Sequence, residues 1–196
     1  MRIGIDLDTA LIDCRRPLSV AAERRGLLPS GWTGDRAELY RRVMALPGGA
    51  VEWRRLLGLA QGPLLPLAEP MAGASAFLAA CRDRGFPVFL FSLRPPAAAF
   101  DAERTDLWGA ATTWLARFGA FRADGFAIPY GNLIFAAHRR ARLDAIAASG
   151  CSHFIEAEDE ETRDPFFVPG IERLLIGAAG WAGISHRLLD GITACR

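Results

Sequence analysis

The chain has 196 residues, of which 51% are hydrophobic and 23% charged, and its formal net charge is +1 at pH 7. Such a composition excludes a disordered chain and predicts one domain, or one domain with a modest insertion, around a sizeable core. The near-zero charge gives no electrostatic case for nucleic acid, and no apolar run reaches the ~18 residues of a membrane span. The four cysteines have no CxxC spacing, and the N-terminus has no signal-peptide pattern. We therefore expect a cytoplasmic protein that binds neither nucleic acid nor membrane.

In chain order, short apolar runs alternate with helical patterns. Strands are predicted at 2–7, 87–93, 132–136, 153–156 and 172–176, and the helices between them at 72–84, 105–118 and 139–149. The run PVFLFSL at 87–93 is continuous enough to be buried on both faces of a parallel sheet. This alternation predicts an α/β fold with a doubly wound, Rossmann-like parallel sheet of about five strands.

The segment between the first two strands has no strand pattern. It reads as helices near 17–25, 35–46 and 51–59, separated by the turn-forming clusters LPSG, LPGG and QGPLLP. A parallel crossover needs only one helix. The extra helices therefore predict a small α-helical cap at 14–69, inserted into a core domain made of 1–13 and 70–196.

Polar residues follow several of these strands. Asp6 and Asp8 end the first strand, Ser92 closes the second with Arg94 just beyond it, and an acidic run from Glu156 follows the fourth. In doubly wound sheets the ligand site lies beyond the carboxyl ends of the strands. The acids, the hydroxyl and the cation are therefore expected at one rim of the sheet.

Three motifs in this order resemble the haloacid dehalogenase (HAD) superfamily. IDLDTALID resembles its first motif, FLFSLRPP its second, and RLDAIAASGCSHFIEAEDE the stretch in which a basic residue begins a helix and acids close strand four. The resemblance covers nearly the whole chain and implies a HAD-like fold with a C1-type cap. The stretch around SLRPPAAAF and ATTWLARFG is most similar to the nucleotidase and polynucleotide-phosphatase-like branches.

The resemblance implies the following catalytic roles. Asp6 would attack phosphorus to form an aspartyl-phosphate, and Asp8 would protonate the leaving oxygen and later deprotonate water. Ser92 would hydrogen-bond a phosphoryl oxygen, and Arg142 would neutralise developing charge.

The same resemblance implies Mg²⁺ as cofactor, because paired carboxylates and a phosphate offer the hard oxygen ligands that it prefers. Its expected ligands are Asp6, Asp8, Glu156 and Glu158. Arg94, with its forked guanidinium, and Thr9 are expected to contact the substrate.

Three positions depart from the family pattern. Ala10 stands where the first motif has Thr or Val, Arg142 where the third has a lysine, and Ala157 where the fourth has a metal-binding aspartate. The leading hypothesis is Mg²⁺-dependent hydrolysis of a small phosphomonoester, either a nucleotide or a metabolite. The alternative is a catalytically impaired HAD-like protein that binds a ligand or partner. Metal-free dehalogenation ranks below both, since dehalogenases lack a second aspartate such as Asp8. The sequence predicts neither the substrate nor the oligomeric state.

Overall fold

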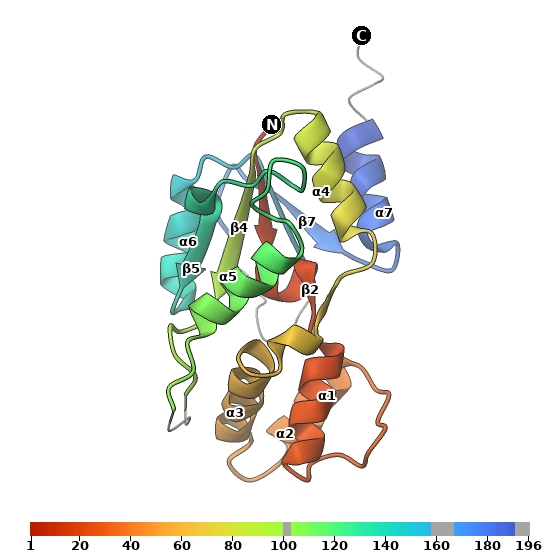
Figure 1. Ribbon diagram of the computed structural model, residues 1–196, viewed down its shortest axis with the longest axis vertical. Coiled ribbons are helices and arrows are strands. Elements are labelled where there is room, and N and C mark those ends of the chain that lie inside the picture. Colours follow the sequence, from red (N-terminus) through yellow and green to blue (C-terminus); the bar gives the residue numbers. More distant parts are fainter. Residues whose placement is uncertain (100–102, 158–166, 191–196) are drawn as a thin grey trace. The chain divides into compact units, whose positions relative to one another are not determined.

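The structure, a computed structural model, describes residues 1–99, 103–157 and 167–190 (Figure 1). The chain forms two compact units. The first comprises Met1–Ile12, Pro70–Leu93 and Phe118–Arg196, and the second comprises Asp13–Glu69 and Arg94–Arg117. The sequence-based division places 94–117 in the core domain; that assignment of core and cap stays a prediction.

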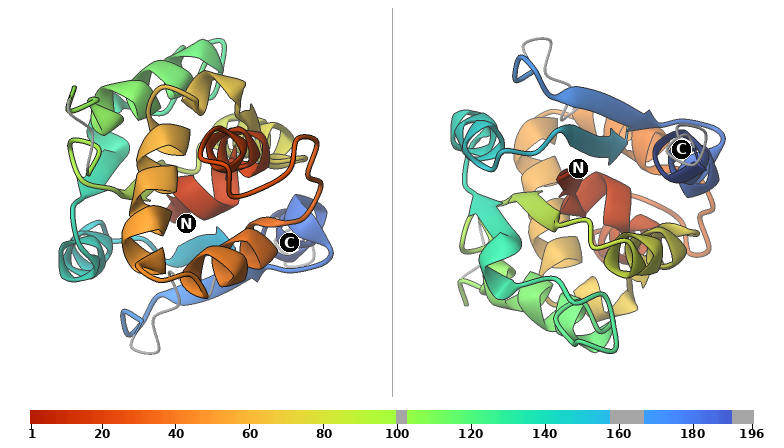
Figure 2. Two further views of the ribbon diagram at one scale, coloured as in Figure 1. Left: turned by 90° about the horizontal axis from the view of Figure 1, so that it is seen from below. Right: turned by 90° about the horizontal axis from the view of Figure 1, so that it is seen from above.

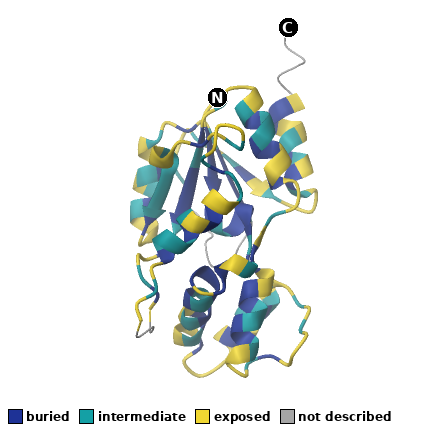
Figure 3. Cartoon of the chain, in the orientation of Figure 1, coloured by how far each residue is buried: buried dark blue, intermediate teal, exposed yellow. Residues whose placement is uncertain are grey.

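The first unit is built on a parallel sheet of five strands in the order β5-β4-β1-β6-β7. β1 lies at its centre, with Ile3 opposite both Val88 of β4 and His153 of β6. All four residues of β1 are buried, and so are most residues of β4 and β6, the two strands that pair with it (Figure 3). The predicted α/β fold is confirmed, and each predicted strand is present to within one residue at either end. The strands are β1 (Ile3–Asp6), β4 (Val88–Leu93), β5 (Leu133–Ala136), β6 (His153–Ala157) and β7 (Glu172–Ile176).

Helices cover both faces of this sheet (Figure 2). α6 (Arg139–Ala148) packs against β4 and β5 on one face, where Ile146 meets a core that includes Phe91 and Phe154. α4 (Ala74–Asp83) and α7 (Gly180–Ser185) cover the other face. α6 begins where the Nδ1 atom of His138 accepts the first-turn N–H of Ala141 at 3.2 Å, a side-chain cap. This cap fixes the start of the helix that carries Arg142 toward the sheet.

The second unit is helical. Its helices are α1 (Arg15–Arg24), α2 (Arg36–Met44), α3 (Gly49–Gln61) and α5 (Leu107–Arg117). Leu39, Trp53 and Leu56 are buried in its core, and Tyr40 packs edge-on against Trp53 with ring centroids 5.1 Å apart. The three helices expected within 14–69 are present. Two short strands that were not expected, β2 (Ile12–Asp13) and β3 (Glu69–Pro70), pair with each other. Within the described ranges, no helix is both long and apolar enough to cross a bilayer.

Candidate active site

A group of polar side chains lies at the carboxyl ends of the central strands of the first unit. Asp6 ends β1, and Asp8 and Thr9 belong to the π-helical turn Leu7–Leu11 that follows it. Ser92 lies near the end of β4, and Glu156 near the end of β6. Because the strands are parallel, these ends meet at one edge of the sheet, where doubly wound proteins bind their ligands.

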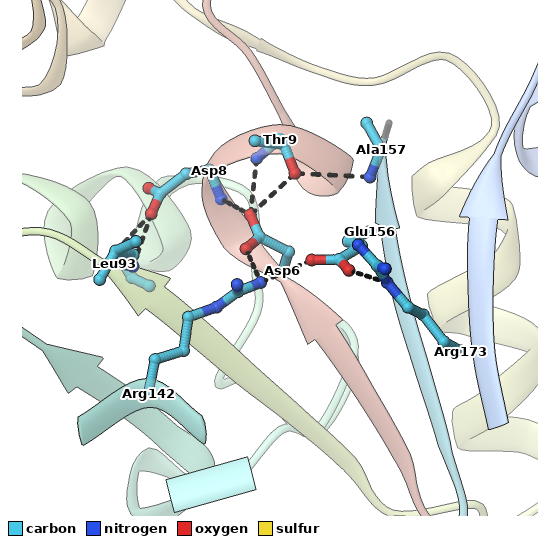
Figure 4. A network of polar contacts seen from close by, with 9 residues as sticks. Asp6, Asp8, Thr9, Leu93, Arg142, Glu156, Ala157 and Arg173 are labelled. Atoms are coloured by element: carbon cyan, nitrogen blue, oxygen red, sulfur yellow. Dashed lines mark hydrogen bonds and ion pairs between the residues drawn. The ribbon is translucent and has the colours of Figure 1, made fainter. Parts of the chain in front are cut away.

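Asp6 is the centre of this group (Figure 4). Its Oδ1 atom accepts three hydrogen bonds, from the N–H groups of Asp8 at 2.9 Å and Thr9 at 2.8 Å and from the Thr9 hydroxyl at 3.0 Å. Its Oδ2 atom accepts from Nη2 of Arg142. Burial raises the pKa of Asp6 to about 6, against the opposing effect of the Arg142 charge, because an ionised carboxylate loses hydration inside the protein.

Arg142 joins two of the acids. Its Nη2 atom also donates to Oε2 of Glu156 at 2.9 Å, and the guanidinium lies 5.2 Å from the ring centroid of Phe154. Oε1 of Glu156 is bound in turn by Nε of Arg173, from β7. Arg142 is 3% exposed and Glu156 is 1% exposed. The four side chains from Asp6 to Arg173 thus form a chain of alternating charges, three of which are buried.

Asp8 faces a different neighbour. Its Oδ2 atom accepts hydrogen bonds from the Ser92 hydroxyl and the Leu93 N–H, both at 2.9 Å. Ser92 itself is fully buried. The Asp8 carboxylate is therefore bound by residues at the end of β4, whereas the Asp6 carboxylate is bound by Arg142 of α6 and by the turn that follows β1.

The structure brings together most of the residues expected at the site: Asp6, Asp8, Thr9, Ser92, Arg142 and Glu156. Arg94 belongs to the second unit, where its Nη1 atom donates to the carbonyl of Leu107 at 3.4 Å. Glu158 lies outside the described residues. The catalytic, substrate-binding and metal-binding roles of all eight residues stay predictions.

Sequence reasoning missed two features of the site. It did not predict Arg173 as a partner of Glu156, nor the Thr9 hydroxyl as a link between Asp6 and the Ala157 N–H, which donates to it at 3.4 Å. A basic residue in the strand after an acidic strand end was the one available signal for Arg173.

The described residues do not fit Mg²⁺. No three His, Cys, Asp or Glu side chains among them are placed to hold a metal ion. Both oxygens of Asp6 accept protein donors, one oxygen of Asp8 accepts two, and Ala157 supplies no side-chain oxygen. Mg²⁺ takes six oxygen ligands in near-octahedral geometry, usually one or two carboxylates together with waters and substrate phosphate, so the engaged oxygens of Asp6 and the alanine at 157 weigh most against it. The expected Mg²⁺ cofactor thus stays a prediction of the resemblance alone.

Comparison with known proteins supports the fold. No protein-family model and no curated protein matches the chain. One similar solved structure is a hydrolase of the haloacid dehalogenase-like family from Streptococcus pneumoniae. It is 13% identical, has a TM-score of 0.57, and the match covers 100% of this chain and 98% of that one. Another is a HAD hydrolase of family IA, variant 3, from Entamoeba histolytica, with 12% identity, a TM-score of 0.51 and coverage of 96% and 89%. The chain therefore has the haloacid dehalogenase-like fold. The cap type and the branch stay predictions.

Proposed function

We propose that this chain hydrolyses a small phosphomonoester, a nucleotide or a metabolite, at Asp6. The fold supports this proposal, and one observation carries it. A buried carboxylate ends the central strand beside a buried guanidinium, while a second carboxylate and a hydroxyl meet at the end of the adjoining strand. A nucleophile, a cation, a proton-transfer group and a phosphate-binding hydroxyl are the parts that phosphoryl transfer needs.

In the first step, a carboxylate oxygen of Asp6 attacks phosphorus, and the bond from phosphorus to the ester oxygen breaks. Asp8 gives its proton to that oxygen, so the alcohol leaves neutral. Arg142 and Ser92 stabilise the charge on the phosphoryl oxygens. In the second step, water attacks the aspartyl-phosphate and gives a proton to Asp8. Inorganic phosphate leaves, and the Asp6 carboxylate is restored.

The experiment is a panel of phosphomonoesters with phosphate release as the readout, run in Mg²⁺ and in EDTA. We expect release from at least one compound, and its loss in Asp6→Asn. The matched control is Asp144→Asn, since Asp144 is an exposed acid on α6 paired with Arg140. Release that is equal in wild type and Asp6→Asn, or no release from any compound in either buffer, refutes hydrolysis at Asp6.

A second function is favoured by a specific observation. Both oxygens of Asp6 are engaged by protein donors, and Ala157 replaces the expected acid. These features favour a protein that binds a phosphorylated ligand without turnover. Calorimetry with inorganic phosphate and orthovanadate distinguishes the two functions, because binding without phosphate release supports the second.

A further inference from the structure

We propose that Arg142 is the fixed cation of this site, and that the site binds a tetrahedral phosphate-like anion without a divalent metal ion. The proposal takes from the proposed function only the class of ligand. It does not require turnover, so it is tested by binding.

The end of β6 offers a metal ion no side-chain ligand at position 157. Ala157 stands where the resemblance implies a metal-binding aspartate, and its N–H donates to the Thr9 hydroxyl, which itself donates to Asp6. Position 157 therefore supplies no side-chain oxygen for a cation, which needs oxygen lone pairs. The chain contains no lysine, so an arginine in place of lysine at 142 is not by itself evidence for a site without metal. The evidence is the combination of Arg142 with an alanine at 157.

Both fully buried acids of the site already have cationic partners. Asp6 and Glu156 are each 1% exposed, and both accept from the same nitrogen of Arg142. Arg173 binds the other oxygen of Glu156. Two buried carboxylates are thus already paired with two guanidinium groups. A divalent ion bound to Asp6 or Glu156 would compete with these guanidinium partners, and leaving a buried charge without its partner is costly.

Nε of Arg142 is buried, and within the described part of the chain it has no hydrogen-bond partner. A guanidinium carries five N–H donors in a fork that matches phosphate oxygens. A buried donor without a partner carries a desolvation cost. An anion that reaches Nε would remove that cost, and a cation would not.

The test is calorimetry of the full chain with orthovanadate and with inorganic phosphate, once in EDTA and once in Mg²⁺. We expect a single site whose affinity differs by less than about twofold between the two buffers. If Mg²⁺ increases the affinity for vanadate or phosphate about tenfold or more, equal to ~1.4 kcal/mol, the proposal is overturned. Absence of binding in both buffers also overturns it. Failure to release phosphate in the substrate panel affects only the proposed hydrolysis.

Electron paramagnetic resonance of Mn²⁺ provides an independent readout. We expect no bound Mn²⁺ that depends on Asp6. Binding in wild type that is lost in Asp6→Ala, which leaves no side-chain oxygen, overturns the proposal, whereas binding that survives Asp6→Ala does not depend on Asp6 and agrees with it.

The cation itself is tested by substitution. Arg142→Met should weaken vanadate binding at least about tenfold in both buffers, because it removes the charge and the fork. Arg142→Lys keeps the charge and serves as the second variant if Arg142→Met fails to fold; we expect partial binding from it. The control is Arg140→Met, an exposed arginine of the same helix. Unchanged binding in a folded Arg142→Met or Arg142→Lys overturns the proposal.

Discussion

Gly4, at the centre of β1, is the position where one methyl group has the clearest calculable effect. A Cβ atom added there would lie 2.7 Å from Cδ2 of Phe154 and 3.2 Å from Cε2 of Phe91. Both rings are buried, and their centroids are 5.6 Å apart. Phe154 also lies beneath the guanidinium of Arg142. Gly4→Ala therefore forces a shift in the core and under the site.

The magnitude follows from two opposing effects. Overpacking a buried position costs about 1–3 kcal/mol. Replacing glycine by alanine returns ~0.4–1 kcal/mol, because the unfolded chain has fewer conformations to lose. The midpoints of these two ranges differ by about 1.3 kcal/mol, so we expect Gly4→Ala to lower the free energy of unfolding by about 1–2 kcal/mol. At ~2–4 °C per kcal/mol for a chain of this size, Tm should fall by about 2–8 °C.

The assay is thermal unfolding followed by circular dichroism. The control is Gly177→Ala, where an added Cβ meets nothing within 4 Å, and the expected change is within ~0.5 kcal/mol. In the double variant Gly4→Ala/Phe154→Leu, the loss should be smaller than the sum of the two single losses, because the smaller side chain makes room for the methyl group. A Tm for Gly4→Ala at or above that of wild type would refute the packing argument.

Three further predictions concern other positions. Thr9→Val removes a hydroxyl that both donates and accepts and should cost about 1–3 kcal/mol in urea unfolding, while Thr9→Ser should cost less; equal losses would contradict this. Arg25 and burial act in opposite directions on Glu52, and the net effect lowers its pKa. The ion pair therefore stabilises the fold above the ordinary glutamate pKa, and this stability is lost as the pH falls through the lowered value. Between pH 7 and pH 3, Glu52→Gln should lose less free energy of unfolding than wild type, by under about 1 kcal/mol. The same loss in both proteins would argue against the ion pair. Burial raises the pKa of the Cys81 thiol to about 12. In a Cys195→Ser chain at pH 8, a thiol reagent should label Cys81 only after denaturant is added, and rapid native labelling would show that the thiol is accessible.

The strands could be predicted from the sequence because buried strands consist mainly of apolar residues, and such runs are visible in the sequence. The run at 88–93 is apolar on both faces, as a central parallel strand must be, and β4 occupies it. The π-helical turn after Asp6 could not be predicted, because it is held by a side chain that accepts two backbone N–H groups. Short pairs such as β2 and β3 carry too few residues for a periodic pattern.

The site was predictable only in part, for a related reason. Asp6, Asp8 and Ser92 lie at strand ends, and strand ends can be read from the chain. The contact of Arg173 with Glu156 depends on register: β7 places Leu175 opposite Glu156 and Arg173 opposite Phe154. A shift of one residue would turn every side chain of β7 to the other face, and no property of the isolated segment fixes that choice.

The central position of β1 has a consequence for how the protein is made. Its two neighbours, β4 and β6, start their pairing with Ile3 from Val88 and His153, 85 and 150 residues further along. At ~5–20 residues per second, a ribosome needs about 8–30 s after Ile3 before His153 is added. β1 thus waits about 8–30 s with an open edge before β6 can pair with it, and during this time the nascent chain can misassemble at the strand that later carries Asp6.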